Sequence, residues 1–194
     1  MSKSEAKKDH ILASGLEVMK ANGYNGTSVK DIVEAAEVPK GSFYNYFESK
    51  EVFAVEAIEK AAADNLRDVS EMLRSSDIQP LQRLEEFFAT NVEGACDGDF
   101  RIGCFLGNMC QEMADNCETI RLKIKCVLGD TTALIEDVLR QAQSDGTLAA
   151  ERDPAIMAEF LFNAWEGALM RMKASKCREP LDAFLTMLPV VVNS

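Results

Sequence analysis

The chain has 194 residues, 47% of them hydrophobic and 27% charged, with six cysteines and one histidine. This apolar content is ample for a packed core, while no stretch approaches the roughly 18 apolar residues that a membrane span needs. The net charge of −11 argues against strong non-specific binding to nucleic acid, because such binding grows with the number of phosphates neutralised. We therefore expect a soluble, cytoplasmic protein with no membrane contact and with reduced thiols.

Apolar residues recur at three- and four-residue spacing along most of the chain, which predicts helices and no strand. Pro39, Pro80, Pro154 and Pro180 mark helix starts, and Ser75-Ser76-Asp77 marks a break. The fold class is therefore all-α, with about nine helices. We expect them over about 6–22, 28–36, 40–47, 49–73, 80–93, 104–114, 118–144, 154–176 and from 180 onward, with a loop from Gly94 to Gly103.

The first helix has an apolar stripe and a clear stop signal. Asn22-Gly23 is typical of a helix carboxy terminus, and we expect the polar residues Met1 to Glu5 to be frayed. The lone His10 is expected on the surface. The stripe that should be buried consists of Ile11, Leu12, Gly15, Leu16 and Met19.

Residues 27–53 pack two short helices, a tight turn and the start of a third helix into one stretch. Thr27 or Ser28 is placed to cap the first of these helices, and Pro39 separates it from the second. On the second, Phe43 and Phe47 lie four residues apart and should anchor the core. This leaves a surface that is polar or amphipathic, made of Lys40, Ser42, Tyr44 and Asn45.

Three further residues complete this surface. Gly41 allows a phosphate or another backbone to approach closely. Ser49 is placed to cap the next helix, and Lys50 at the exposed amino end of that helix would combine its cation with free backbone N–H groups. The whole pattern is typical of a helix-turn-helix with a phosphate clamp.

The run T-S-V-x-D-I-x-x-A-A-x-V-x-K-G-S-F-Y-x-Y-F-x-S-K-E, from Thr27 to Glu51, resembles the DNA-binding signature of the TetR family of bacterial transcriptional repressors. The resemblance implies a DNA-binding domain over 1–50, an effector-binding and dimerisation domain over 51–194, and a dimer that binds a palindromic DNA operator. The residues carried over as DNA-binding are Thr27, Ser28, Lys40, Gly41, Ser42, Tyr44, Asn45, Tyr46 and Lys50.

The negative charge is unevenly distributed along the chain. Residues 1–55 hold 7 lysines and 8 acidic residues, whereas the remainder holds 14 basic and 24 acidic residues. A near-neutral reading head on an acidic body should bind duplex DNA non-specifically only weakly, so that specific contacts must carry more of the affinity.

The last two helices are predicted to form the dimer. The helix from Pro154 has an apolar stripe too wide for a single packing partner, and two such helices per chain suffice for a four-helix bundle with a second copy. On the final helix the predicted dimer residues are Leu181, Phe184, Leu185 and Leu188.

The run G-A-C-D-G-D-F-R-I-G-C-F-L-G-N, followed by Trp165 and Lys173, resembles the electrophile-sensing TetR branch that represses N-ethylmaleimide reductase. By that resemblance Cys104 is the sensing thiol, Cys96 a possible second thiol and Lys173 a neighbouring cation. A thiol at a helix amino end beside a lysine is expected to be reactive. The alternative is that Cys104 only packs as a small buried residue. Further thiols at Cys110, Cys126 and Cys177 leave no resolving partner identifiable.

A reversible apolar ligand is the competing effector. Soft and aromatic side chains shape adaptable pockets, and the candidates here are Phe105, Met109, Met113 and Trp165. No nucleophile elbow, phosphate loop or metal-ligand spacing is present, so we expect no enzyme activity and no cofactor. A helical interaction module without DNA binding is the remote alternative, but it leaves the stretch from Thr27 to Lys50 unexplained.

Overall fold

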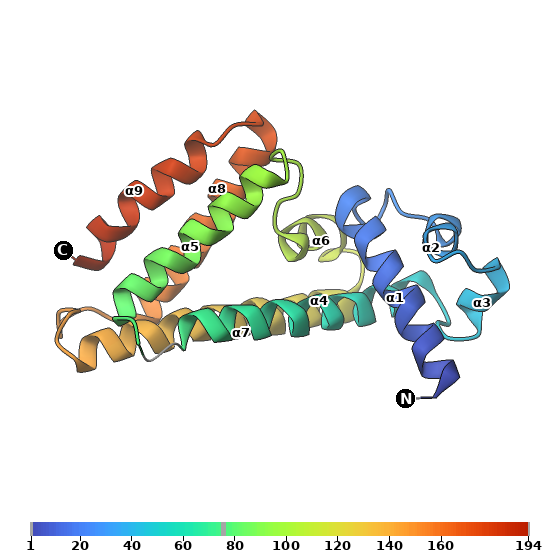
Figure 1. Ribbon diagram of the computed structural model, residues 1–194, viewed down its shortest axis with the longest axis horizontal. Helices are drawn as coiled ribbons and strands as arrows, with labels where there is room; N and C mark the ends of the chain where they lie inside the picture. The colour runs from blue at the N-terminus through green and yellow to red at the C-terminus, as the bar shows by residue number, and fades with distance from the viewer. Residues whose placement is uncertain (1, 75–76, 194) are drawn as a thin grey trace. The chain divides into compact units, whose positions relative to one another are not determined.

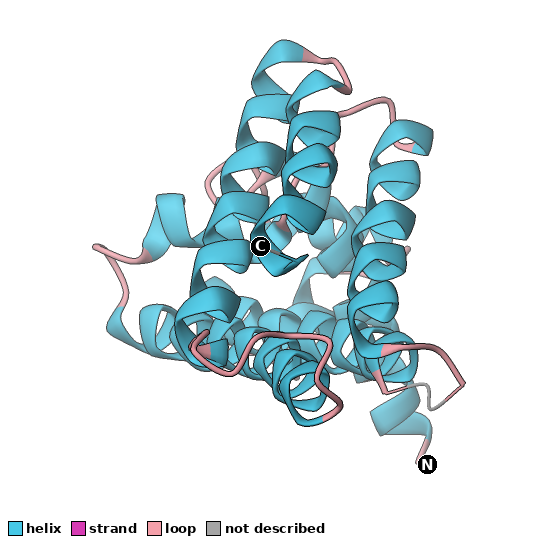
Figure 2. Cartoon of the chain, turned by 90° about the vertical axis from the view of Figure 1, so that its left-hand side faces the viewer, coloured by secondary structure: helices cyan, strands magenta, loops and turns pink. Residues whose placement is uncertain are grey.

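The computed structural model describes residues 2–74 and 77–193. Within these ranges the chain forms nine α-helices and no strand, which confirms the predicted fold class (Figures 1 and 2). The helices are α1 (Lys3–Asn22), α2 (Val29–Ala35), α3 (Lys40–Tyr44), α4 (Lys50–Leu73), α5 (Pro80–Asp97), α6 (Phe105–Met113), α7 (Glu118–Ser144), α8 (Pro154–Ser175) and α9 (Glu179–Asn193).

Helix α1 begins earlier than predicted. The hydroxyl of Ser2 accepts the N–H of Glu5 at 3.2 Å, and the carboxylate of Glu5 accepts the N–H of Ser2 at 2.6 Å. This reciprocal capping box satisfies donors that a helix end otherwise leaves unpaired, so the expectation of a frayed start was wrong for residues 2–5. Met1 lies outside the described residues. The predicted stripe is buried as expected, and Gly23 ends the helix.

Other boundaries moved by a few residues. Helix α3 ends at Tyr44, because the N–H groups of Tyr46 and Phe47 both turn back to the carbonyl of Phe43. Helix α5 continues through Gly94 to Asp97, so the predicted loop is confined to residues 98–104. Cys104 directly precedes α6. The predicted break at Ser75-Ser76 lies outside the described residues.

The chain divides into two compact units that alternate along the sequence. The first unit comprises the chain up to Asp64 together with Phe105–Val127, and the second comprises Asn65–Cys104 together with the chain from Leu128. The first unit thus contains α1, α2, α3 and α6, and the second contains α5, α8 and α9. Helices α4 and α7 contribute a segment to each.

The core of the first unit is built around three phenylalanine rings. Phe43, Phe47 and Phe53 are fully buried, with ring centroids 5.0 to 5.6 Å apart. Gly15 lets α1 approach this cluster, since a Cβ atom there would lie 2.5 Å from Cζ of Phe53 and 2.7 Å from Cγ2 of Ile32. The apolar anchors predicted for residues 27–53 therefore form the floor beneath α3.

The core of the second unit is a stack of aromatic rings between α5, α8 and α9. Phe88, Trp165 and Phe184 have mutual centroid distances of 4.7 to 5.3 Å. Leu181 and Leu188 are buried beside them. Helix α9 runs alongside α8 and also contacts α5, as Figure 1 shows.

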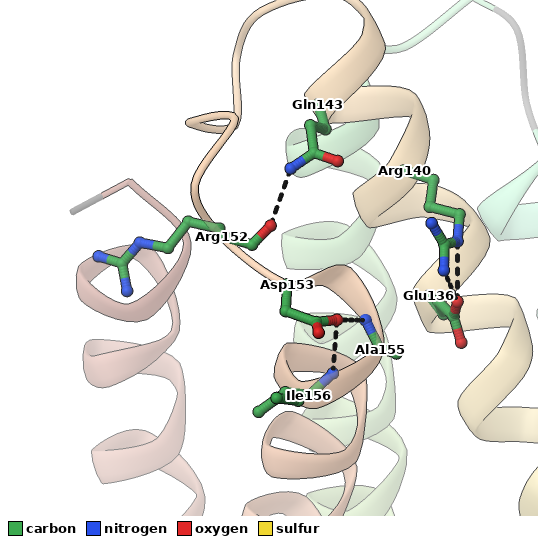
Figure 3. A network of polar contacts seen from close by, with 7 residues as sticks. All are labelled: Glu136, Arg140, Gln143, Arg152, Asp153, Ala155 and Ile156. Atoms are coloured by element: carbon green, nitrogen blue, oxygen red, sulfur yellow. Dashed lines mark hydrogen bonds and ion pairs between the residues drawn. The ribbon is translucent and has the colours of Figure 1, made fainter.

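The start of α8 is defined by polar contacts (Figure 3). The carboxylate of Asp153 accepts the N–H groups of Ala155 at 2.9 Å and Ile156 at 3.3 Å, and Pro154 occupies the first turn. The side-chain amide of Gln143, near the end of α7, donates to the carbonyl of Arg152 at 2.8 Å. These contacts confirm the predicted Asp153-Pro154 start and connect it to α7.

Candidate nucleic-acid interface and thiol site

Helix α3 presents a polar edge above the phenylalanine core. Phe43 is fully buried, while Lys40, Gly41 and Asn45 are exposed and the Tyr44 side chain is 55% exposed. No atom lies within 4 Å of the position that a Cβ on Gly41 would take, so the backbone there is open to an approaching group. The four exposed residues share one accessible edge, and their chemistry suits phosphates and base edges.

Two of the predicted contact residues are withdrawn from that edge. Thr27 is 1% exposed, and its hydroxyl donates to the carbonyl of Gly23 at 2.7 Å, closing the turn that follows α1. Ser42 is 7% exposed and precedes the fully buried Phe43 in the short helix. Both were expected at the DNA surface. The structure instead gives them packing and turn-closing roles.

Ser28 is exposed but serves first as a helix cap. Its hydroxyl accepts the N–H of Asp31 at 3.2 Å, and the carboxylate of Asp31 accepts the N–H of Ser28 at 2.7 Å. The hydrogen bonds from Ser28 lower the pKa of Asp31, so this carboxylate stays ionised at neutral pH. The capping box sets where α2 begins and therefore the position of the turn that leads to α3.

Lys50 is half-buried, although it was expected to be exposed. Its ammonium lies 4.0 Å from the centroid of the Tyr24 ring, a cation–π contact. Burial lowers the pKa of Lys50, and the nearby carboxylates of Glu51, Glu112 and Asp31 oppose that shift. The cation is therefore partly engaged within the protein. Tyr46, another predicted contact, is also half-buried.

A residue that sequence reasoning missed holds the loop between α1 and α2. The carboxylate of Glu112, on α6, accepts the N–H groups of Asn25 at 2.7 Å and Tyr24 at 3.2 Å. Gly23 makes room for it: a Cβ there would lie 2.2 Å from Oε1 of Glu112. Gly23 also has φ of +75°, which disfavours other residues. No local pattern could reveal this contact, because its partners lie 87 and 88 residues apart.

The predicted sensing residues all lie in the second unit. Cys104 and Cys96 are half-buried and pack against its core. A Cβ on Gly103 would lie 3.7 Å from Cδ of Lys173, so the lysine stem passes beside the residue that precedes the thiol. Cys104 also shares a hydrogen bond with the carboxyl group of Glu166 on α8, a partner that the sequence did not suggest. The guanidinium of Arg178 donates to Sγ of Cys96 at 3.6 Å.

The four predicted pocket residues are divided between the two cores. Met109 and Met113 are buried in the first unit, and Phe105 is half-buried at the start of the same helix. Trp165 belongs to the aromatic stack of the second unit. A cavity shared by all four therefore stays a prediction.

The predicted dimer residues differ in burial, and their part in a dimer stays a prediction. Leu181, Phe184 and Leu188 are buried in the core of their own protomer, and Leu185 is half-buried. Both faces of α9 are apolar, so periodicity alone could not tell which face turns inward. The exposed apolar face of α8 and α9 instead includes Phe160, at 56%, and Met187, at 52%. A groove of about 540 Å³ runs there, and its lining includes Ala164, Ala183 and the predicted dimer residues Phe184 and Leu188.

An all-helical chain with an exposed helix-turn-helix on an aromatic core is the architecture of a DNA-binding regulator. Two family models match: "Bacterial regulatory proteins, tetR family" over residues 11–57 and "Tetracyclin repressor-like, C-terminal domain" over residues 80–188. The chain belongs to the TetR family of transcriptional regulators. None of the helices described here combines the length and apolar character that crossing a membrane requires.

Relatives of known name support this assignment over nearly the whole chain. The transcriptional repressor DhaR of Mycobacterium sp. (strain GP1) is 35% identical, over 93% of this chain and 89% of its own. A crystal structure of a TetR regulatory protein from Rhodobacter sphaeroides superposes with a TM-score of 0.89 at 33% identity, over 95% and 97% of the two chains. Reduced Escherichia coli NemR superposes with a TM-score of 0.86 at 27% identity, over 96% and 97%.

Proposed function

We infer that this regulator binds a palindromic operator as a homodimer and is released from it by a small effector. The observation that carries this proposal is the edge of α3, where Lys40, Gly41, Tyr44 and Asn45 are exposed above buried Phe43. Such an edge can enter a major groove with donors and an aromatic ring facing the DNA. A bacterial repressor of this kind acts in the cytoplasm, on the chromosome.

The apolar face of α8 and α9 supports the dimer. Large side chains such as Phe160 and Met187 are more than half exposed in the single chain, and covering them with a second copy would remove that surface from water. A twofold dimer presents two copies of α3 to two half-sites about 34–36 Å apart, or a multiple of that spacing. Operator binding should therefore depend on this face.

The effector is proposed to act on the part of the chain that follows the helix-turn-helix. An electrophile or oxidant that modifies Cys104, with Cys96 as a second thiol and Lys173 as a nearby cation, is the first candidate. A reversible apolar ligand bordered by Phe105, Met109, Met113 or Trp165 is the second. Either needs a coupling free energy of only about 1–3 kcal/mol to lower operator affinity roughly 5–150-fold.

A single assay tests the proposal and separates the two effectors. The purified protein is titrated, at fixed salt, onto duplex DNA from the flanks of its own coding region, and onto a scrambled duplex as control. Preferential binding to a palindromic segment supports the repressor function, whereas equal binding to both duplexes overturns it. The operator complex is then treated with a small electrophile. Release of wild type but not of Cys104→Ser supports the thiol, while equal release of both leaves the apolar ligand.

A further inference from the structure

The thiol of Cys104 has an ionisable partner whose role the fold does not explain. Cys104 directly precedes α6, and its thiol shares a hydrogen bond with the carboxyl group of Glu166 on α8. The adjacent residue supports this placement, because a Cβ on Gly103 would lie 3.7 Å from Cδ of Lys173 and 4.0 Å from the carbonyl oxygen of Leu169. Positions 166, 169 and 173 follow the i, i+3, i+7 spacing of one helix face, so residues 103–104 lie along that face.

Glu166 is an unusual residue to find here. It is half-buried, next to Trp165 of the aromatic stack, and burial raises its pKa, with the hydrogen bond to Cys104 opposing that shift. The titratable group that contacts it is the thiol of Cys104, while the stem of Lys173, two turns further along α8, passes beside Gly103. Burying a carboxyl group here costs desolvation free energy, which destabilises the fold. A functional role for its contact with the thiol would explain why the chain carries it.

We propose that Glu166 is a positioning residue that restrains the reactivity of Cys104, by accepting its S–H and holding the thiol in the protonated, weakly nucleophilic form. Forming a thiolate beside an ionised carboxylate places two negative charges in contact, which disfavours the thiolate. Lys173 acts in the opposite direction as a nearby cation. Cys104 would then respond to strong electrophiles while ignoring weak ones.

The restraint has a measurable signature because alkylating agents react with the thiolate. With iodoacetamide, the Cys104 sulfur attacks the methylene carbon, the S–C bond forms, iodide leaves and the thiol proton passes to the buffer. Each unit by which the pKa of the thiol is higher lowers the thiolate fraction at neutral pH about tenfold. Because the neighbouring carboxylate opposes ionisation of the thiol, removing it should shift the whole rate profile to lower pH.

The experiment follows alkylation of the full-length protein by iodoacetamide at several pH values between about 6 and 9, with each cysteine resolved by peptide mass spectrometry. For Glu166→Gln, the rate at Cys104 near neutral pH should rise roughly three- to tenfold, and its midpoint should move to lower pH. Cys96 serves as the internal reference, because its Sγ contacts Arg178 instead. Glu159→Gln, exposed on the same helix, should match wild type.

An unchanged or lower rate at Cys104 in folded Glu166→Gln overturns the inference. If that variant is poorly folded by circular dichroism, Glu166→Asp decides, since a shorter carboxylate should give a rate between those of wild type and a carboxylate-free site. The inference rests on the proposed thiol sensing for its biological meaning, but its readout needs no DNA. A faster Cys104 whose adduct leaves the operator complex intact would refute thiol sensing and leave the role of Glu166 standing.

Discussion

Two surfaces of this regulator, the edge of α3 and the outer face of α8 and α9, expose side chains of opposite character to water. The edge of α3 exposes a cation, an amide and one phenol over a fully buried core, whereas the outer face of α8 and α9 exposes large apolar side chains beside a core that is equally well packed. The first surface is stable in water and gains its partner through charge and hydrogen bonds. The second would gain stability if another apolar surface covered it.

This difference is consistent with the two kinds of partner that we propose. A polyanion in water can replace the hydration of α3 with phosphate and base contacts, which are directional and depend on single residues. Binding at the α8–α9 face would instead depend on the total apolar area that is buried and on the fit of the two shapes. A charged substitution on the α8–α9 face should therefore abolish dimerisation outright. A substitution on the α3 edge should lower operator affinity by the contribution of one residue.

The largest effect is expected on the apolar face. Phe160→Glu or Met187→Glu should give monomers in sedimentation, because each places a charge in the proposed contact without disturbing the protomer core. Loss of the second half-site should lower operator affinity by about 10²- to 10⁴-fold. Leu122→Glu, a similar change at a 50% exposed position on α7, is the control. A persistent dimer in both variants would contradict the proposed face.

An intermediate effect is expected on α3. Tyr44→Ala and Lys40→Ala should each cost roughly 1–3 kcal/mol of operator affinity and relax sequence preference, because these side chains face base edges or phosphates. Dimerisation and helicity should stay as in wild type. Fluorescence anisotropy with the operator and single-base variants measures both quantities, with Lys125→Ala on α7 as the control. Wild-type affinity in both variants would show that α3 does not dock as proposed.

The smallest effect is expected at Lys50, the half-buried cation at the start of α4. Its ammonium lies over the Tyr24 ring, so Lys50→Ala should weaken binding to every duplex alike, by about threefold, and lower the salt slope by less than about 0.9. Loss of the cation–π contact should also reduce the free energy of unfolding by about 0.5–1 kcal/mol. A loss confined to one base position would instead make Lys50 a base-reading residue. Salt titrations and thermal melts are the measurements.

Local features of the fold were readable from the sequence. The stripe of α1, the stop at Gly23 and the Asp153-Pro154 start each depend on residues within one or two helical turns. The aromatic anchors Phe43 and Phe47 were readable for the same reason. Each of these patterns lies within a short stretch of sequence, so its structure could be predicted without knowing any tertiary contact.

Features that depend on distant partners were not readable. The sequence shows that α9 is apolar around most of its circumference, yet only packing against α5 and α8 decides that Leu181 turns inward and Met187 outward. Glu166 had no signal at all, because a carboxylate on an amphipathic helix is usually a solvated residue.

The contact between Glu112 and the loop at Gly23 constrains how this domain can evolve or be transplanted. A chimaera that transplants residues 1–50 onto the body of another regulator would carry the loop but leave behind the acceptor for the N–H groups of Tyr24 and Asn25. Each unpaired donor that becomes buried costs about 1–3 kcal/mol. A side chain at position 23 would strain the backbone, whose φ there is +75°, and would displace the carboxylate of Glu112, since a Cβ would lie 2.2 Å from its Oε1. These two positions should therefore evolve, and be grafted, as a pair.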